Sequence, residues 1–496
     1  MTRELATPGD PVPVDVDVAI VGAGPTGAFA ANLCGRYGLS AVALERATEI
    51  HDLPRAVALW DDVARILDSA GLFEPLRPQT CIHAGGEFVD SQGKRLIGFD
   101  LPEGLITLNG HPPVRGFHQP DLERVLRAGI RRFPAVALRP SCEVVGFEQE
   151  SEHVSLVLQD GATPATLRAR WLIGCDGAAS FVRRACGIGW ESLGYDREWL
   201  VVDALVDPGV TLTGHTVQVC DPARLVTLVP GPGRLRRWEI ALLPGESRRE
   251  MEAPGQVAAL LAPWVQPDQV EIVRAVVYRF HATVADSFRN GRVFLAGDAA
   301  HQTPPFLGQG LCSGLRDADN LIWKLAQVKR YGADEALLDS YSAERQPMAA
   351  AMVRHAVNAG LAIETYAAME RGGPPPSAEL RAYAYGGSAQ LPTLRTGWLE
   401  IDGVKASRWI GERIPCGRVH CGDRDGDFDQ VVGPRWALVS ASDPTGGLRA
   451  DERLAFERLG AAFVSALEPT GALLALLLEH PTVIVRPDHI VYGVRA

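Results

Sequence analysis

Three glycines and a glutamate near the start of the chain are spaced to hold a dinucleotide. They are Gly22, Gly24, Gly27 and Glu45, in the segment DVDVAIVGAGPTGAFAANLCGRYGLSAVALE (residues 15–45). The first glycine allows a tight turn, the second lets the backbone approach a pyrophosphate, and the third lets a helix pack closely on a strand. A carboxylate about 20 residues further on can bind the 2′-hydroxyl of an adenosine ribose. The pattern therefore predicts FAD or NAD, whose ribose carries no phosphate there.

A second cluster of chemistry-bearing residues lies late in the chain, in GRVFLAGDAAHQTPPFLGQGLCSGLRDADNLIWKLA (residues 291–326). Asp298 follows an apolar strand, where a carboxylate can bind a chain of hydroxyl groups. A helix then begins, so that backbone N–H groups and the helix dipole can face a ring system; the residues at this point are Gly308, Gln309, Gly310 and Leu311. A flavin ring, which gains negative charge at its pyrimidine edge on reduction, suits this terminus better than a nicotinamide ring. We therefore predict that both clusters bind one FAD molecule.

Three further polar residues could reach this cofactor, and each has a structural alternative. Arg55 lies in a loop past the adenosine strand and could contact phosphate or ribityl oxygens, or could be a surface arginine. Gln119, where a helix starts, could offer its amide to a ligand or make a contact within the helix start. Asp176 follows a buried strand, at the edge where open α/β sheets bind ligands.

Three apolar runs, at residues 16–21, 171–174 and 293–296, predict buried strands, and a small-residue helix follows the first of them. Asp176 follows the second strand, and Asp298 follows the third. The predicted fold class is α/β, with a Rossmann-like, discontinuous FAD-binding domain formed by residues 1–82, 111–190 and 286–370.

The remaining segments predict two other units. Residues 83–110 and 191–285 contain short apolar strands separated by Pro, Gly and Asp, which indicates an inserted antiparallel sheet that binds substrate. A linker (371–393) leads to a small C-terminal domain (394–496) with a predicted thioredoxin-like shape but no CxxC motif. Polar or aromatic residues of the sheet could face a ligand, although strand alternation sends about half of them to solvent; they are His215, Gln218, Arg224, Arg236, Trp238, Tyr278 and His281.

Composition narrows the class of protein. The 496 residues carry a net charge of −11 without basic blocks, which argues against nucleic acid as a partner. No apolar run reaches membrane-spanning length, and the first fourteen residues lack a signal-peptide core. Nine scattered cysteines indicate reduced thiols, and their spacing predicts no metal site. We therefore expect a soluble, cytoplasmic protein that binds no membrane.

Taken together, GAGPTG with Glu45, CDGAASFVRR and GDAAHQTPPFLGQG resemble the three fingerprints of single-component FAD-dependent aromatic hydroxylases, the group that includes p-hydroxybenzoate and phenol hydroxylases. Within that group PRAVALWDD, FHQPDLE, VCDPAR, RRWEIALLPGE and GQGLCSGLRDADNLIWKLA are most similar to the 3-(3-hydroxyphenyl)propionate hydroxylases. The resemblance covers most of residues 15–360.

The resemblance implies roles for individual residues. Gly22, Gly24 and Gly27 would hold the FAD diphosphate, and Glu45, followed by Arg46, the adenosine side. Arg55 and Gln119 would contact the diphosphate or ribityl region, Asp298 the ribityl chain, and residues 308–311 the pyrimidine edge. Asp176 belongs to a motif linked to FAD and NAD(P)H. Close relatives carry asparagine where this chain has Cys312, and a thiol donates only weakly.

The implied reaction consumes NAD(P)H and O₂ and hydroxylates a phenolic substrate through a flavin C(4a)-hydroperoxide. A group near the phenol oxygen should help to deprotonate it. His215 and Tyr278 are the candidates from the sheet, with Asp61 and Asp62 as alternatives. A homodimer is also compatible with the sequence. Two other readings stay open: an FAD-dependent dehydrogenase or oxidase without oxygen insertion, and a non-catalytic flavin-sensing module.

Overall fold

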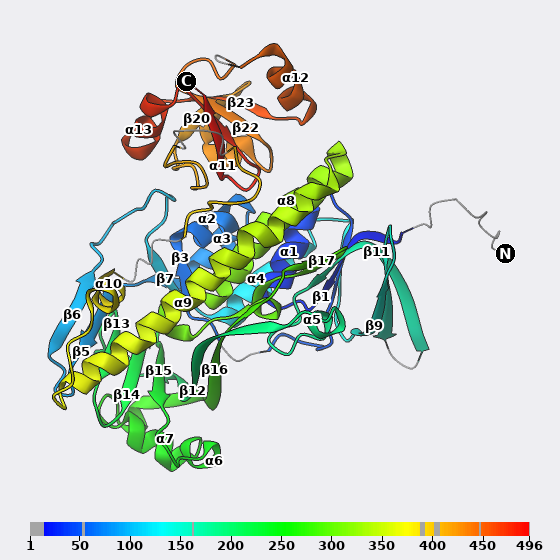
Figure 1. Ribbon diagram of the computed structural model, residues 1–496. Coiled ribbons are helices and arrows are strands. Elements are labelled where there is room, and N and C mark those ends of the chain that lie inside the picture. The colour runs from blue at the N-terminus through cyan, green and yellow to red at the C-terminus, as the bar shows by residue number, and fades with distance from the viewer. Residues whose placement is uncertain are drawn as a thin grey trace.

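The computed structural model describes residues 14–51, 55–160, 163–386, 392–400, 407–445 and 448–495. A central α/β unit carries a long antiparallel sheet on one side and a smaller C-terminal unit on the other (Figure 1). The mixed α/β class predicted from the sequence is confirmed. Within the described ranges, none of the helices is both long and apolar enough to cross a membrane.

A mostly parallel sheet forms the central unit. Its strands follow the order β17, β18, β11, β1, β2, β8, and β10 and β9 extend it from β11. The strand bounds are β1 Val16–Val21, β2 Ala41–Leu44, β8 Val136–Arg139, β9 Glu143–Gln149, β10 Val154–Asp160, β11 Thr163–Gly174, β17 Arg289–Asn290 and β18 Val293–Leu295. Nearly all residues of β1, β2 and β18 are buried, so both faces of these strands are covered. In the register, Val21 lies opposite Gly174, and Gly174 lies opposite Leu295. The carboxyl ends of β1, β11 and β18 are therefore level.

Helices α1 Pro25–Arg36, α4 Gln119–Ile130 and α5 Phe181–Ala185 contact strands of this sheet. Helix α8 Gly310–Tyr331 packs on α1, and α2 Asp61–Ser69 and α9 Asp339–Met369 both contact α8. Helix α8 and the turn that carries Asp298 both contact Thr26 in the first turn of α1: a Cβ placed on Gly314 would lie 2.4 Å from the Thr26 Oγ1 atom, and one on Gly297 would lie 2.7 Å from it. The absence of side chains at these two glycines lets α8 and that turn lie against the start of α1.

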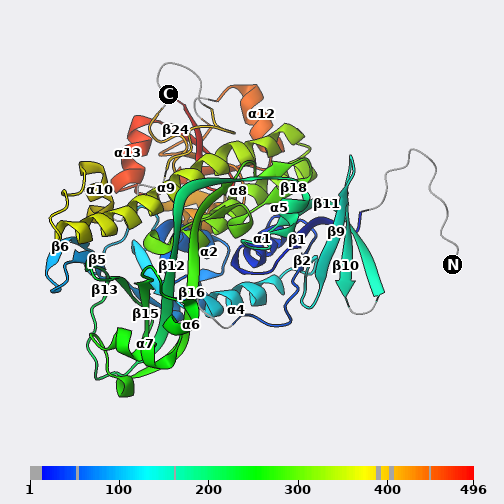
Figure 2. The same cartoon turned by 60° about the horizontal axis from the view of Figure 1, so that its bottom comes forward.

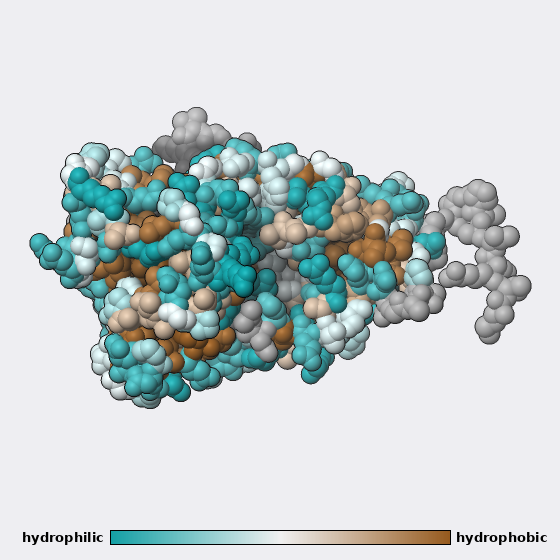
Figure 3. All heavy atoms as spheres, turned by 90° about the horizontal axis from the view of Figure 1, so that it is seen from below, coloured by the Kyte–Doolittle hydropathy of each residue, from teal (hydrophilic) through white to brown (hydrophobic). Residues whose placement is uncertain are grey.

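The second sheet has the order β19, β16, β12, β15, β14, β13, β5, β6 and is antiparallel except where β13 pairs with β5. Its strands are β5 Gly85–Val89, β6 Arg95–Asp100, β12 Trp190–Val206, β13 His215–Cys220, β14 Leu225–Pro230, β15 Leu235–Ala241, β16 Val270–Ala285 and β19 His301–Gln302. The long strands β12 and β16 run side by side out of the central unit (Figure 2). A three-stranded sheet of β3 Ala58–Trp60, β7 Val114–Phe117 and β4 Thr80–Ile82 lies between the two units. Seen from below, the molecule presents hydrophilic residues interspersed with smaller hydrophobic patches (Figure 3).

The C-terminal unit contains a six-stranded sheet in the order β21, β20, β23, β22, β24, β25. The strands are β20 Arg418–Cys421, β21 Arg424–Asp427, β22 Ala437–Ser440, β23 Ala462–Ala466, β24 Thr482–Val485 and β25 Val491–Arg495, with helices α11 Phe428–Val432, α12 Ala450–Arg458 and α13 Gly471–Glu479. Its thioredoxin-like relationship stays a prediction. The segment 371–393, predicted as a linker, contains helix α10 Ala378–Gly386, which packs on α9 and β6. Residues 387–391 of that segment lie outside the described part of the chain.

Candidate active site

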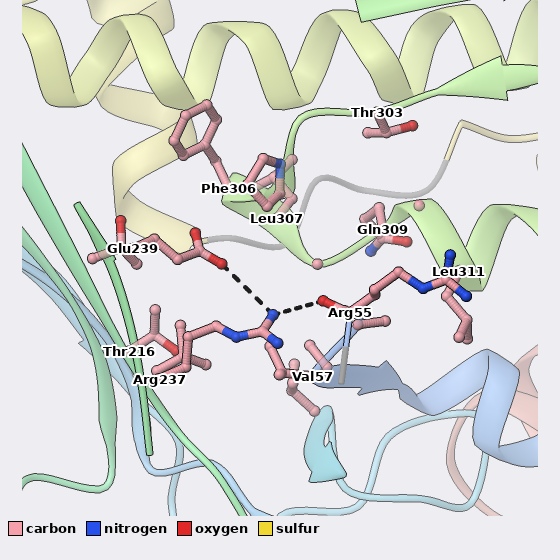
Figure 4. Close-up of a pocket in the computed structure, with 18 of the residues that line it drawn as sticks. Arg55, Val57, Thr216, Arg237, Glu239, Thr303, Phe306, Leu307, Gln309 and Leu311 are labelled. Carbon is pink, nitrogen blue, oxygen red and sulfur yellow. Dashed lines mark hydrogen bonds and ion pairs between the residues drawn. The ribbon is translucent and has the colours of Figure 1, made fainter. Parts of the chain in front are cut away.

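A cavity of about 440 Å³ lies between the carboxyl edge of the central sheet and the long antiparallel sheet. Both predicted clusters line it: Gly24 from the first, and Asp298 and residues 308–311 from the second. The opposite wall is formed by residues of β5, β6, β12, β13, β14, β15 and β16 of the second sheet. Figure 4 shows the side chains of this wall facing the turn that carries Phe306, Leu307 and Gln309. The cavity thus joins the predicted nucleotide site to the predicted substrate sheet.

The first glycine turn has the geometry that a diphosphate site needs. Gly22 has φ +94°, and a Cβ there would lie 2.4 Å from the Cys175 carbonyl oxygen. A Cβ on Gly27 would lie 1.9 Å from the Gly22 oxygen. Gly24, by contrast, has open space around its Cβ position in the protein. Two glycines are therefore required by packing within the protein, whereas Gly24 is required only if a ligand lies against it.

Glu45 is tied to this turn. Its Oε2 atom accepts a hydrogen bond from the Ala23 backbone N–H at 2.8 Å, and its Oε1 atom accepts one from Ala47 at 2.9 Å. The carboxylate is half-buried at the end of β2 and retains lone pairs for ribose hydroxyls. This position suits the predicted ribose contact.

Replacing Glu45 by alanine is expected to weaken FAD binding by about 1–3 kcal/mol, because a charged hydrogen-bond acceptor is lost. Titration of FAD-free protein with FAD, followed by flavin fluorescence, measures the change. The Glu49→Ala variant removes an exposed carboxylate four residues further on and should bind FAD as the wild type does. Equal affinities for the two variants would contradict the ribose assignment.

The Asp298 turn is fixed by a buried network beneath it. Asp317 on α8 accepts a hydrogen bond from the Gly297 backbone N–H at 3.0 Å and lies 2.7 Å from the His301 Nε2 atom and 2.8 Å from the Arg345 Nε atom. Burial opposes ionisation of Asp317, but His301 and Arg345 lower its pKa to about 2. Asp298 itself faces the cavity. Its side chain is reachable by solvent through that cavity, yet the surrounding protein raises its pKa.

The variant Asp298→Ala is expected to bind FAD roughly 10- to 150-fold more weakly, the equivalent of losing hydrogen bonds to a charged acceptor. Flavin content after gel filtration measures the loss, and full flavin content would show that the ribityl contact is misplaced.

The helix start at residues 308–311 presents polar groups to the cavity. Gly308 has φ +61° and packs on β3, where a Cβ would lie 2.6 Å from the Ala58 Cβ atom. Gln309 is fully buried: its Oε1 atom accepts a hydrogen bond from Arg316 at 2.8 Å, whereas its Nε2 atom has no partner in the described structure. Asp62 fixes Arg316 through two hydrogen bonds of 2.6 and 2.8 Å. A buried amide donor in a cavity wall costs free energy unless a ligand accepts from it.

These features fit FAD. The open Gly24 position, the unpartnered Gln309 amide and the cavity-facing Asp298 lie along one continuous cavity, between the N-terminal ends of α1 and α8. Helix N-termini favour negative groups, and a flavin nucleotide carries them at its diphosphate and, after reduction, at its ring.

The other predicted cofactor residues occupy varied positions. Arg55 lines the cavity, and Arg46 lies exposed beside Glu45. Gln119 also lines the cavity, but its oxygen accepts from the Ala56 backbone N–H at 2.7 Å and its amide donates to Glu123 at 2.8 Å. Asp176 accepts from the Ser180 hydroxyl at 2.6 Å and the Val182 N–H at 3.0 Å, which fixes the start of α5.

Cys312 is buried, and its thiol points at the Ala58 carbonyl oxygen at 3.6 Å. Burial raises its pKa to about 11. The side chain therefore packs beneath the helix start and does not line the cavity.

The predicted candidates from the sheet separate into two groups. Tyr278 and Gln218 line the cavity. His215 lies away from it, with its Nε2 atom 2.9 Å from Asp100 and its Nδ1 atom 3.2 Å from Thr213. The others also lie outside: Trp238 is in the core behind the sheet, Arg224 binds Glu246, Arg236 donates to backbone carbonyls, and His281 is exposed near Asp196.

The alternative carboxylates are engaged elsewhere. Asp61 accepts hydrogen bonds from Thr107 at 2.6 Å and Asn109 at 2.8 Å, and Asp62 is paired with Arg316. Neither carboxylate lines the cavity. Both therefore position the surrounding loops and are not placed to meet a substrate.

A charged cluster that sequence reasoning missed lies in the cavity wall. Asp203 on β12 accepts from Arg237 Nε at 2.8 Å and from Arg274 Nε at 2.9 Å. Arg274 also donates to the Tyr278 hydroxyl at 2.9 Å. Glu239, two residues after Arg237 on β15, shares its face and is 4% exposed. The signal in RRWEIALLP was the alternation of Arg237 and Glu239 with apolar Trp238 and Ile240.

The fold and the cavity define an FAD-binding α/β protein with an antiparallel sheet beside its predicted flavin site. Residues 15–356 match the family model described as FAD binding domain. A 3-(3-hydroxy-phenyl)propionate/3-hydroxycinnamic acid hydroxylase of Klebsiella pneumoniae subsp. pneumoniae is 34% identical over 466 residues, 91% of this chain and 82% of that protein. The chain belongs to the family of FAD-dependent aromatic hydroxylases.

Two further proteins extend the comparison. The protein of the same description from Shigella sonnei is 38% identical over 347 residues, 70% of this chain, and the match spans 62% of that relative. The crystal structure of the flavin-dependent monooxygenase PieE in complex with FAD and substrate superposes with a TM-score of 0.81, covering 97% of this chain and 96% of PieE at 23% identity. At that identity, the similarity concerns the fold.

Proposed function

We propose that the protein hydroxylates a phenolic ring, using NAD(P)H and O₂. One observation carries the proposal: a single cavity joins the glycine turn and the Gly308–Gly310 helix start to a sheet wall that carries both charged and aromatic side chains. When bound, FAD would supply hydride acceptance from NAD(P)H and the activation of O₂ for transfer to the ring. Relatives are named for 3-(3-hydroxyphenyl)propionate and 3-hydroxycinnamic acid, so these phenols are the first to test.

The residues of the protein would bind the cofactor, orient the substrate and enclose the site. Glu45 and the Gly22–Gly27 turn would hold the adenosine diphosphate half, Asp298 the ribityl chain, and residues 308–311 the flavin ring. Phe280, Phe306 and Leu307 line the cavity and would exclude water from the ring. Arg237 and Arg274 would place positive charge beside a phenolic oxygen.

A panel of phenols tests the function. Purified FAD-loaded protein is mixed with NADH or NADPH, and consumption of the nicotinamide is recorded with and without each phenol. The proposal requires a phenol that stimulates consumption and a product that gains one ¹⁸O atom from ¹⁸O₂. Stimulated consumption that yields only hydrogen peroxide, or an alcohol oxidised without oxygen gain, would instead favour an oxidase or dehydrogenase.

Gel filtration with light scattering tests the predicted homodimer, and fractionation of the source cells tests the predicted cytoplasmic location.

A further inference from the structure

Glu239 extends from β15 into the cavity, where Figure 4 shows it beside Arg237 and across from the turn that carries Leu307. The Arg237 Nη1 atom lies 3.8 Å from the Glu239 Oε1 atom, an ion-pair distance and too long for a hydrogen bond. The donors of Arg237 serve other acceptors: Nε and Nη2 donate to Asp203, at 2.8 and 3.2 Å, and Nη1 donates to the Arg55 carbonyl oxygen at 2.6 Å. The Glu239 carboxylate can therefore accept a hydrogen bond from a ligand.

The charges around Glu239 suit a proton transfer. Arg237 and Arg274 share the single carboxylate of Asp203, so Glu239 completes a buried cluster of two cations and two anions. When a neutral phenol gives its proton to Glu239, the net charge of the cluster and the phenol together is unchanged. The negative charge moves to the phenol oxygen and stays beside the same arginines. The transfer therefore creates no unpaired charge in the buried cavity, which would cost free energy.

We propose that Glu239 accepts the proton of the substrate's phenolic hydroxyl; this proposal rests on the proposed hydroxylase function. The phenol O–H bond breaks, an O–H bond forms on a Glu239 carboxylate oxygen, and the electron pair stays on the phenolate. The phenolate is the more reactive nucleophile toward an oxygen-transferring group.

Burial raises the Glu239 pKa to about 7, with Asp203 adding to the effect and Arg237 and Arg274 opposing it. A base with such a pKa is ionised above neutral pH and still holds a proton well. The titratable or charged groups that share the cavity or its wall with Glu239 are Arg55, His83, Glu87, Cys175, Asp203, Arg237, Arg274, Tyr278 and Asp298. Among them His83 is the rival acceptor, because its Nε2 atom is buried without a partner in the described structure. Burial lowers the His83 pKa to about 4, so it holds a proton far less readily than Glu239.

Binding spectra without turnover test the proposal. FAD-loaded wild type, Glu239→Gln, His83→Gln and Glu198→Gln are titrated with 3-hydroxycinnamate at pH 8 in the absence of a nicotinamide. The phenolate of this probe absorbs at longer wavelength than the phenol. We expect a phenolate band in the wild type, in His83→Gln and in Glu198→Gln, which removes a half-exposed carboxylate of the same sheet that does not line the cavity. The band should fall at least about tenfold in Glu239→Gln. An undiminished band in Glu239→Gln, or its loss in His83→Gln alone, would overturn the assignment.

Turnover gives an independent readout. In the wild type kcat should fall about tenfold per pH unit below pH 7, as Glu239 becomes protonated. Glu239→Gln should lower kcat by about 10²- to 10⁴-fold at pH 8, the usual contribution of a general base, and should lose this pH dependence. Wild-type protein that produces no hydroxylated phenol would defeat the proposed function itself. Wild-type hydroxylation that Glu239→Gln retains with the same pH profile would defeat the Glu239 assignment alone.

A measurement on the wild type covers the case in which Glu239→Gln does not retain FAD. With the proton kept on Glu239, phenolate formation above pH 7 releases no proton to the solvent. A pH-indicator dye in weak buffer should therefore report no proton release as the phenolate band grows. Release of one proton per bound phenol would contradict the transfer to Glu239.

Discussion

The Gly24→Val variant is expected to fold normally and to lose FAD. A Cβ at Gly24 has no protein atom within 4 Å, and the residue has φ −66° and ψ −173°, an extended conformation that valine adopts readily. A diphosphate against this backbone would collide with the new side chain and lose its backbone N–H partners. Overpacking and lost charged hydrogen bonds together correspond to FAD binding about 10²- to 10⁴-fold weaker.

Flavin content, FAD titration and urea unfolding of the FAD-free protein measure this outcome. Gly24→Ala should give a smaller loss of affinity in the same direction. Gly27→Ala is the contrasting variant, because its Cβ would lie 1.9 Å from the Gly22 oxygen and should destabilise the FAD-free protein as well. A Gly24→Val protein that retains full flavin would show that the diphosphate does not bind at this turn.

The Glu344→Ala variant is expected to lower the free energy of unfolding by about 3–5 kcal/mol. Glu344 on α9 is buried, with Lys324 at 2.9 Å and Arg486, from the C-terminal unit, at 3.0 Å. It also accepts from the Trp398 backbone N–H at 2.8 Å. Its removal leaves two buried cations without this shared partner. The network joins the C-terminal unit to the two long helices, so that unit should loosen first.

Urea unfolding, with proteolysis of the C-terminal unit as a second readout, checks this expectation. Asp339→Ala removes an exposed carboxylate from the same helix and should cost less than about 1 kcal/mol. Burial opposes ionisation of Glu344, but Arg486 and Lys324 lower its pKa to about 2. The contribution of Glu344 to the free energy of unfolding is therefore complete above the ordinary glutamate pKa, and it is lost as the pH falls from about 4.3 toward 2. Equal stability of Glu344→Ala and Asp339→Ala would show that the network contributes little.

The sequence predicted those parts of the site whose geometry is local. The glycine turn lies within a strand, turn and helix that follow one another in the chain, so residue spacing alone defines it. Asp298 and the Gly308–Gly310 helix start could be predicted for the same reason. Level carboxyl ends of β1, β11 and β18 then bring these local features to one sheet edge. The predicted FAD cofactor and hydroxylase class are confirmed, whereas the role of each residue stays a prediction.

The cavity wall from the second sheet was harder to predict because it depends on which face of each strand meets the central unit. A shift of one residue exchanges the faces. Sequence reasoning named Arg236 and Trp238, which point behind the sheet, and passed over Arg237 and Glu239 beside them. His215 was chosen for its chemistry, but its strand β13 directs it to Asp100. Pairing between β12, β15 and β16, set by contacts far apart in the chain, decides these orientations.

One FAD should span the cavity from the first glycine turn to the helix start at residues 308–311. A crystal structure of the protein with FAD would show whether it does. We predict the diphosphate against Gly24 and the flavin pyrimidine edge beside Gln309 and the first turn of α8. A flavin ring bound away from residues 308–311, or an adenosine half bound away from Glu45, would show that these two segments do not hold one FAD.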